Sequence, residues 1–398
     1  MTEKQIIVAS THPFMADMRL GTAYLADALC KRGWHVVYIE QPTSPLHLIH
    51  PQSRMRARQK AAGALRGFSG KMQTFEFGSG RLTLLPTIVP WPHVNKTFFK
   101  GAHMLDNWWK YAFPRPTTVL KKVGLTQPSA LLTDSPYFYS LAQHLDLPTV
   151  YRYADRIQYF SEITPALIAK QRVALQSADM VLYTSKALKA DLAGRTGPVH
   201  YLPNGVDVDL YVKTHREPAE LAGISGPRII YSGTLGPWLD VEALRMAATS
   251  LPDMQFILLG KSTVNLASLR ALSNIHLLGT VPYYRVPEFL QHCDVGIIPF
   301  DIVTQADLVK AINPLKLYEY CAAGLPVVSY ISEETKKAGD LIDYYGAPEE
   351  LALSIRSALA RTDENQRVRR QEWADTMSWR SRGAELEDII RKLSKPDR

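Results

Sequence analysis

The chain has 398 residues, of which 46% are hydrophobic and 21% are charged, and its formal net charge is +8. This length exceeds what one hydrophobic core usually supports, and the composition excludes a disordered protein, so we expect two globular α/β domains. The sequence contains no run of about 18 apolar residues, which argues against a helix that spans a bilayer.

The first residues of the chain and its cysteines indicate in which cellular compartment the protein is expected. The first residues lead directly into the strand-like segment Gln5–Ser10 and lack the zones of a secretion signal. The three cysteines, Cys30, Cys293 and Cys321, lie far apart and form no CxxC pair. Such usage is typical of a reducing compartment and gives no structural zinc site. We therefore expect a cytoplasmic protein.

The first half of the chain alternates strand and helix patterns. Gln5–Ser10, a helix from about Gly21 to Arg32 and the strand His35–Glu40 form a βαβ unit, which requires a parallel sheet. Residues 41–80 are rich in Arg, Gly, Pro and Ser and are predicted as loop with short helix. Further strands are predicted at residues 81–85, 130–133, 149–153, 180–184 and 199–202, with a helix at 165–177.

The loop after the first strand is a candidate acceptor site. His12, Asp17 and Arg19 lie in it, at the strand end where an acceptor would approach. His12 also fits the role of an ordinary loop histidine. The loop lacks a GxGxxG pattern, which weakens any dehydrogenase interpretation.

Residues 51–124 form a strongly basic segment with 13 Lys or Arg against Glu76 and Asp106. Aromatic residues such as Phe68 and Trp91 lie among these cations. The mixture suits contact with an anionic membrane surface, where cations meet lipid headgroups and aromatic rings settle at the interface. An ordinary solvated basic face over core aromatics explains it too, and nucleic acid is a third alternative that we do not expect.

A second alternating series follows a linker at 206–226, which is rich in turn-forming residues. Strands are predicted at 228–232, 255–259, 275–278, 295–299 and 327–329, and helices at 348–361, 364–375 and 380–393. The sequence thus predicts two Rossmann-like domains, 1–205 and 227–372, that face each other across a cleft. Residues 373–398 are expected to form a helix that returns to the first domain.

The segment 313–326 has the features of a ligand-binding helix. Asn313 suits the N-cap, Pro314 the first helical position and Gly324 a left-handed C-terminal stop. The helix begins at the carboxyl edge of a parallel sheet, where its amide groups would face an anion. Lys316 in the first turn makes sense opposite a diphosphate, and Glu319 on the same face could hold ribose hydroxyls. A solvent-exposed Lys316–Glu319 pair is the alternative.

Two further segments end strands at the same edge. Gly233 permits close approach of a phosphate, and Thr234 supplies a hydroxyl group, although a simple tight turn would look the same. Phe300 follows the strand at 295–299, where a nucleotide base could stack.

Residues 228–330 resemble the donor domain of GT-B glycosyltransferases related to family 4. The resemblance rests on the glycine loop after the linker, on Gly279-Thr-Val281 and on the NPLK-YEY-A-GLPVV helix that begins at Asn313. It implies a GT-B fold and a nucleotide-sugar donor, with no metal. Retaining members often carry two glutamates eight positions apart, but here only Glu319 is present and Ala311 occupies the first position.

The N-terminal half resembles, more weakly, transferases of the xanthan glucuronosyltransferase and teichuronic acid type, over Ile6–Asp27 and Val150–Phe160. In the first of these, an inverting type, an aspartate after a Val-Tyr-Arg strand is the base, which implies that role for Asp155. Direct displacement at an anomeric carbon also needs such a carboxylate. Alternatively, Asp155 caps a helix or pairs with Arg152 or Arg156.

These observations predict an inverting glycosyltransferase that is peripheral on the inner face of the plasma membrane. Its donor would be a UDP-linked sugar, with a uronic acid as one candidate whose carboxylate meets Lys310 or Arg285. Its acceptor would be lipid-linked or a polysaccharide. The alternatives are a nucleotide-sugar epimerase of the same fold and a non-enzymatic membrane or nucleic-acid adaptor.

Overall fold

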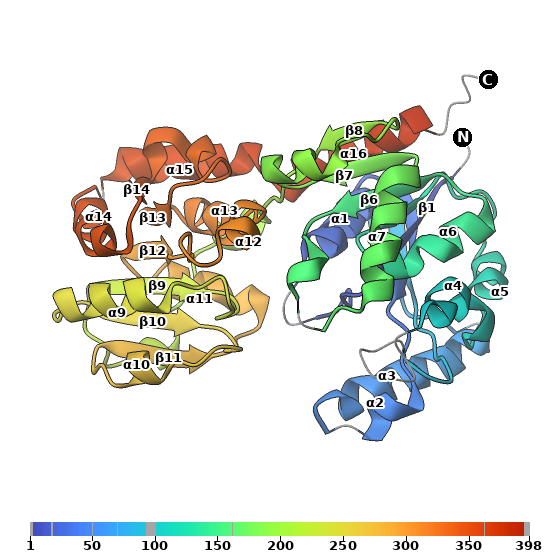
Figure 1. Ribbon diagram of the computed structural model, residues 1–398, viewed down its shortest axis with the longest axis horizontal. Helices are drawn as coiled ribbons and strands as arrows, with labels where there is room; N and C mark the ends of the chain where they lie inside the picture. The colour runs from blue at the N-terminus through green and yellow to red at the C-terminus, as the bar shows by residue number, and fades with distance from the viewer. Residues whose placement is uncertain are drawn as a thin grey trace. The chain divides into compact units, whose positions relative to one another are not determined.

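The computed structural model describes residues 3–16, 19–49, 51–69, 71–92, 101–160, 162–361 and 363–393. The chain divides into two compact units, which Figure 1 shows as ribbons. The first unit comprises Met1–Thr184, Leu188–Leu202 and Arg382–Arg398, and the second comprises Ser185–Ala187 and Pro203–Ser381. Each unit is built on one sheet of its own.

The first unit contains an eight-stranded sheet in the order β3-β4-β2-β1-β5-β6-β7-β8, in which only β3 runs antiparallel to its neighbour. Helices lie on both faces of the sheet (Figure 1). The strands are β1 Lys4–Ser10, β2 Trp34–Glu40, β3 Thr74–Phe77, β4 Gly80–Leu85, β5 Leu131–Thr133, β6 Thr149–Tyr153, β7 Met180–Tyr183 and β8 Val199–Tyr201. The helices are α1 Gly21–Lys31, α2 Pro45–Ile49, α3 Pro51–Phe68, α4 Ala102–Tyr111, α5 Pro116–Lys122, α6 Tyr139–Leu145 and α7 Pro165–Ser177.

The sheet of the first unit is buried on both sides, as parallel sheets usually are. β2 is buried along its whole length, and β1 from Gln5 onward. Pairing of β1 with both β2 and β5 brings the carboxyl ends of these central strands to one edge. The predicted parallel sheet is therefore confirmed.

The prediction of loop with short helix for residues 41–80 was wrong. This stretch contains the 18-residue helix α3 and strand β3. α3 packs through small residues, since Ala57 and Ala64 are almost fully buried. A face of alanine and glycine gives little hydrophobic periodicity, although its Ala, Arg, Gln and Lys content favours a helix.

The second unit contains a six-stranded parallel sheet in the order β11-β10-β9-β12-β13-β14. Its strands are β9 Arg228–Ser232, β10 Gln255–Leu259, β11 Ile275–Gly279, β12 Val295–Ile298, β13 Val327–Tyr330 and β14 Asp343–Tyr345. Its helices are α8 Val208–Tyr211, α9 Val241–Ser250, α10 Ala267–Arg270, α11 Val286–Leu290, α12 Ala306–Lys310, α13 Leu315–Ala322, α14 Leu351–Leu359 and α15 Glu364–Thr376. All five strands predicted for this half are present.

The last helix, α16 (Trp379–Leu393), begins in the second unit and continues in the first from Arg382. In the first unit the buried carboxylate of Glu387 accepts hydrogen bonds from Lys4 at 2.9 Å and Arg32 at 2.5 Å. Burial alone would raise the pKa of Glu387, but these two cations lower it to about 2. The ion pairs therefore fasten α16 to β1 and to the end of α1.

Among the residues that the structure describes, no helix combines the length and the apolar character needed to cross a bilayer.

Candidate functional site

The carboxyl edge of the second sheet carries a loop with unusual backbone geometry. Gly233, directly after β9, has φ 126°, and Gly260, directly after β10, has φ 141°. A Cβ atom on Gly260 would lie 2.0 Å from the carbonyl oxygen of Gly233. The backbone of the Gly233 loop therefore contacts the backbone of the neighbouring strand end directly, and no L side chain would fit at Gly260.

Lys316 points at this loop from the first turn of α13. A Cβ atom on Gly233 would lie 3.4 Å from the Lys316 Nζ. The same Nζ lies 4.8 Å from the ring centroids of both Tyr231 and Phe300. Burial lowers the pKa of Lys316 to about 8, and the nearby Glu319 carboxylate acts in the opposite direction. The structure thus brings Gly233 and Lys316 together, with the ammonium group held between two rings.

Glu319 lies one turn further along α13 and is half-buried. Burial raises its pKa, while the charge of Lys316 and a hydrogen bond with Tyr211 lower it. Lys316 and Glu319 therefore influence each other's charge in partly buried surroundings, which differs from the alternative of a freely solvated pair. Thr234 is half-buried beside them, and its carbonyl oxygen accepts a hydrogen bond of 2.8 Å from the Tyr231 hydroxyl.

Two predictions at this edge need correction. Asn313 is not the N-cap of α13, because that position is Pro314 and lacks a side-chain cap. The Asn313 carboxamide instead binds the Tyr318 hydroxyl at 3.0 Å and contacts Glu334, and its Oδ1 accepts from the Asn204 amide at 3.0 Å. This buried network holds the segment that leads into α13.

Phe300 is the second correction. It is only 1% exposed, and its ring stacks on Tyr330 at a centroid distance of 5.3 Å. Since Lys316 lies over the same ring, Phe300 has no exposed face on which a nucleotide base could stack. The sequence predicted the position of Phe300 after β12 correctly, but it did not predict that the Phe300 ring turns into the core.

The carboxyl edge of the first sheet gathers polar side chains from three neighbouring strands. Ser10 ends β1, Asp134 directly follows β5, and Asp155 lies two residues beyond β6. The Ser10 hydroxyl donates a hydrogen bond of 2.9 Å to one oxygen of Asp134. No donor among the described residues reaches the other, buried oxygen of Asp134. Sequence reasoning missed Asp134, although an acid directly after a strand of the same sheet was the available signal.

Asp155 is exposed at this edge. The surrounding protein desolvates its carboxyl group and raises its pKa; the charges of Arg152 and His12 lower the pKa, and Asp134 raises it further. Arg156 is committed elsewhere, because it binds Asp191 at 2.7 and 3.1 Å. Arg152 and His12 thus favour the ionised Asp155 carboxylate, whereas desolvation and Asp134 oppose it.

The three predicted acceptor residues have different outcomes. His12 is exposed and interacts electrostatically with Asp155. Asp17 lies outside the described residues. Arg19 is turned inward, with its side chain 11% exposed, 3.5 Å from Asp27 and stacked over Phe14. These contacts are structural and do not support an acceptor-binding role for Arg19.

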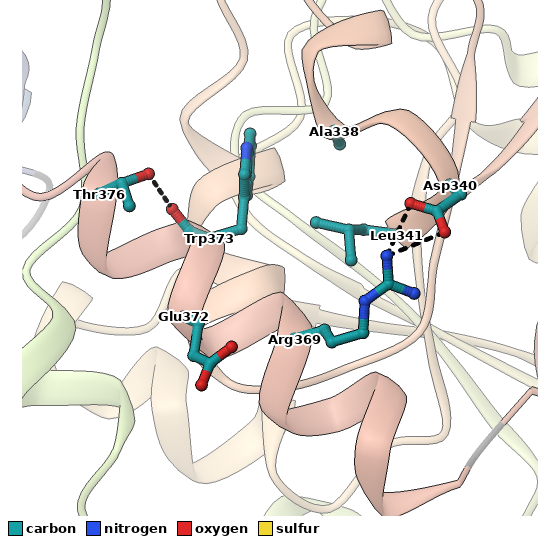
Figure 2. A pocket seen from close by; sticks show the side chains of 7 residues that line it. All are labelled: Ala338, Asp340, Leu341, Arg369, Glu372, Trp373 and Thr376. Carbon is teal, nitrogen blue, oxygen red and sulfur yellow. Dashed lines mark hydrogen bonds and ion pairs between the residues drawn. The ribbon is translucent and has the colours of Figure 1, made fainter.

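Figure 2 shows a hollow of about 320 Å³ in the second unit. Its walls come from α15 and from the 3₁₀ helix Lys336–Leu341, and Arg369 and Asp340 close one side as an ion pair of 2.9 Å. The lining contains none of the predicted donor residues, and its strongest charges already neutralise each other. We do not assign it to the reaction.

Solved structures identify the class to which this architecture belongs. The chain matches sucrose-phosphate synthase from Thermosynechococcus elongatus with a TM-score of 0.70 at 17% identity, over 98% of this chain and 99% of that one. It also matches Anabaena HepE in complex with UDP-glucose, with a TM-score of 0.63 at 13% identity, over 97% and 99% of the two chains. The fold is therefore that of the GT-B glycosyltransferases, as predicted.

Sequence comparison gives closer family information. Residues 241–388 match the family model described as "Glycosyl transferase-like". A stretch of 174 residues, 41% of this chain, is 31% identical to a Bacillus subtilis (strain 168) protein named for teichuronic acid biosynthesis, the glycosyltransferase TuaH. That stretch spans 43% of TuaH, less than half of the relative's length. The predicted resemblance to GT-B transferases of teichuronic acid type is confirmed.

Proposed function

We propose that this protein is a glycosyltransferase that moves a sugar from a UDP-linked donor to a lipid-linked or polysaccharide acceptor. The observation that carries the proposal is the contact between Lys316 and the Gly233 loop. The family match over 241–388 includes α13, and the HepE structure, of similar fold, contains UDP-glucose. The relative TuaH is named for the biosynthesis of a polysaccharide. All three support the assignment.

The donor would bind at the carboxyl edge of the second sheet. The Lys316 ammonium group and the free amides at the start of α13 provide positive charge for a diphosphate. Gly233 lets the backbone approach the phosphates, and Thr234 adds a hydroxyl group. The Glu319 carboxylate is suited to accept hydrogen bonds from ribose hydroxyls. In this proposal protein groups supply the charge opposite the diphosphate, with no metal.

The reaction would invert the anomeric centre. The Asp155 carboxylate takes the proton from an acceptor hydroxyl, the acceptor oxygen forms the new bond to the anomeric carbon, and UDP leaves with the electrons of the old bond. Ala311 supports this route, because retaining members of the resembled family often carry a glutamate at that position and here the site is a buried alanine. His12 would contact the acceptor beside Asp155.

The transferred sugar is proposed to be a uronic acid. Of the two candidate partners for its carboxylate, Arg285 is engaged with Glu220 at 2.9 Å and with Glu288 at 3.0 Å. Lys310 is exposed at the end of α12. We therefore retain Lys310 and withdraw Arg285.

We also propose that the first unit contacts an anionic membrane surface through residues 51–124, which would keep the enzyme peripheral on the inner face of the plasma membrane. The solvent face of α3 supports this. Met55 is 75%, Leu65 62% and Phe68 58% exposed. Four arginines on this helix are also exposed: Arg54, Arg56, Arg58 and Arg66. An exposed apolar row among cations suits a lipid headgroup layer.

Aromatic contacts extend this surface beyond α3. The rings of Phe68 and Phe113 lie 5.0 Å apart, and the Lys122 ammonium group lies 5.4 Å from the Phe68 ring. Trp91 and Tyr111, each about two-fifths exposed, lie 6.0 Å apart. In contrast, Trp108 of the same segment is fully buried. Only part of the aromatic content of 51–124 is therefore available to a membrane.

A binding and turnover assay tests the proposed activity. We expect UDP and UDP-sugars to raise the melting temperature, because a ligand that binds only the folded state stabilises it by mass action. We expect sugar transfer only when an acceptor is added. Interconversion of the donor without acceptor would instead indicate an epimerase, and no effect of any nucleoside diphosphate would remove the proposal.

A further inference from the structure

The charge of the proposed ligand exceeds what Lys316 alone can balance. The diphosphate of a UDP-sugar carries about two negative charges, and enzymes usually oppose such groups with several cations or amides. Lys316 carries one positive charge and shares its surroundings with the Glu319 carboxylate. A second cation near the Gly233 loop would therefore complete the site.

The order of the strands indicates where that cation stands. β9 lies between β10 and β12 in the sheet. The Gly233 loop after β9 therefore has Lys316 of α13 on one side and the segment after β10 on the other. That segment begins with Gly260 and continues with Lys261.

Backbone hydrogen bonds hold Lys261 against the Gly233 loop. The Leu235 amide donates to the Lys261 carbonyl at 3.0 Å, and the Thr263 amide donates to the Leu235 carbonyl at 2.9 Å. Leu235 and Ser262 also form an isolated parallel bridge. The backbone of Lys261 is thus fixed beside Leu235, two residues from Gly233, by a short two-stranded contact, and its exposed side chain extends from this position.

Lys261 is also available for a ligand. It is exposed, and no carboxylate among the described residues forms an ion pair with it. Two other cations of this unit are paired with acids, since Arg245 pairs with Glu242 at 2.6 Å and Arg285 with Glu220 at 2.9 Å. The Lys261 ammonium group is therefore available to an anionic ligand at this edge.

We propose that Lys261 is a second diphosphate-binding residue, which approaches the phosphates from the side of the Gly233 loop opposite Lys316. This inference rests on the proposed function and adds a residue that the motif resemblance does not mark. The pairing of the two loops would hold the Lys261 backbone close enough to the Gly233 loop for both ammonium groups to reach one diphosphate.

Calorimetric titration of the full chain with UDP and with uridine tests the inference. We expect Lys261→Ala to weaken UDP binding by about tenfold or more, with uridine binding unchanged, because a charge-assisted contact to phosphate is lost. Lys261→Arg should restore most of the UDP affinity. Arg270→Ala is the charge-matched control, since Arg270 is an exposed cation of the same unit at the end of α10, five residues before the amino end of β11, and this variant should bind UDP like the unmodified protein.

The outcomes separate this inference from the function on which it rests. If the unmodified protein binds no nucleoside diphosphate, the proposed function fails first. Suppose that the unmodified protein binds UDP and that Lys316→Ala weakens this binding. If Lys261→Ala then leaves the UDP affinity unchanged, Lys261 has no role and the inference is overturned. Equal loss of UDP and uridine in Lys261→Ala would also overturn it, because that pattern indicates a distorted loop.

Discussion

The carboxyl edges of the two sheets hold their polar groups in opposite ways. In the second unit, Lys316 is fixed between two rings and against the Gly233 loop, and its charge is partly desolvated. In the first unit, Asp155 and His12 are exposed. A cation packed between rings is suited to one ligand of constant shape, whereas side chains exposed at a sheet edge leave room for a larger acceptor, even though the surrounding protein also desolvates the Asp155 carboxyl group. We infer that the donor site is preorganised and that the acceptor side completes itself around its substrate.

The largest expected effect comes from a substitution in the first unit that removes the proposed general base. Asp155→Asn should lower kcat by roughly 10²- to 10⁴-fold, the usual contribution of a general base, and leave UDP affinity unchanged. Steady-state transfer assays with calorimetry measure both. Asp146→Asn is the control, because Asp146 is exposed in the same unit and its φ of 52° suits asparagine. Normal turnover in Asp155→Asn would refute the base assignment.

The next effect concerns the second unit. Lys316→Ala should weaken UDP binding by about 10- to 100-fold, since the variant loses a charged contact to the diphosphate in a partly desolvated site. The protein should remain folded, because the substitution removes a desolvated ammonium group from between two rings. Calorimetry and thermal unfolding check these two statements. If the Lys316→Ala variant retains its UDP affinity, the diphosphate does not contact Lys316. The packed Lys316 would then no longer distinguish a donor site in the second unit from the exposed edge of the first.

Sequence reasoning succeeded where backbone periodicity decides the structure. The parallel strands and α7 follow from patterns of buried residues and turns, and so does the presence of a helix around Lys316, although its N-cap is Pro314 and not Asn313. It failed where side-chain direction decides the outcome. Phe300 follows a predicted strand and Arg19 lies in the predicted loop before α1, but each turns inward to aromatic partners. Sequence spacing carries no information about this choice.

The third failure had a different cause. α3 was missed because its packed face consists of alanine and glycine, whose burial gives almost no hydrophobic signal. The same helix presents its large apolar residues to solvent, which reverses the usual amphipathic pattern. Asp134 was missed for a simpler reason, because no motif marks it and only the sheet order places it beside Ser10.

A third prediction compares the exposed apolar residues of α3 in the first unit with those of the second unit. Leu65→Asp should lower binding to vesicles that contain anionic lipid by about tenfold, because it removes apolar contact and adds a like charge to the headgroup layer. Leu353→Asp is the matched control, because Leu353 is 71% exposed on α14 of the second unit. Flotation of both variants measures the difference, with activity on a soluble acceptor as a check of folding.

Lipid and nucleic acid are distinguishable in the same experiment. Neutral vesicles should bind weakly, and an added oligonucleotide should not compete with anionic vesicles. Equal flotation of the Leu65→Asp and Leu353→Asp variants would contradict the membrane proposal, and binding to the oligonucleotide alone would favour the nucleic-acid alternative.

The last expected effect is a pH dependence of UDP binding, which Lys316 of the second unit would cause. Burial lowers the pKa of Lys316 to about 8 in the empty site, and a bound diphosphate would raise it again. Binding above pH 8 therefore requires uptake of a proton, so UDP affinity should be constant between pH 7 and 7.5 and fall by at most about tenfold per pH unit above 8. The diphosphate itself titrates near pH 6 and does not interfere.

Calorimetry of UDP between pH 7 and 9.5 measures this slope, with Lys316→Arg as the control. Arginine stays charged throughout the range, so the variant should bind UDP with little pH dependence. A flat profile in the unmodified protein, together with weak binding by Lys316→Ala, would mean that Lys316 contacts the diphosphate but is not desolvated beforehand. The two units would then be equally open to solvent, and preorganisation of the donor site would have to come from the Gly233–Gly260 backbone contact alone.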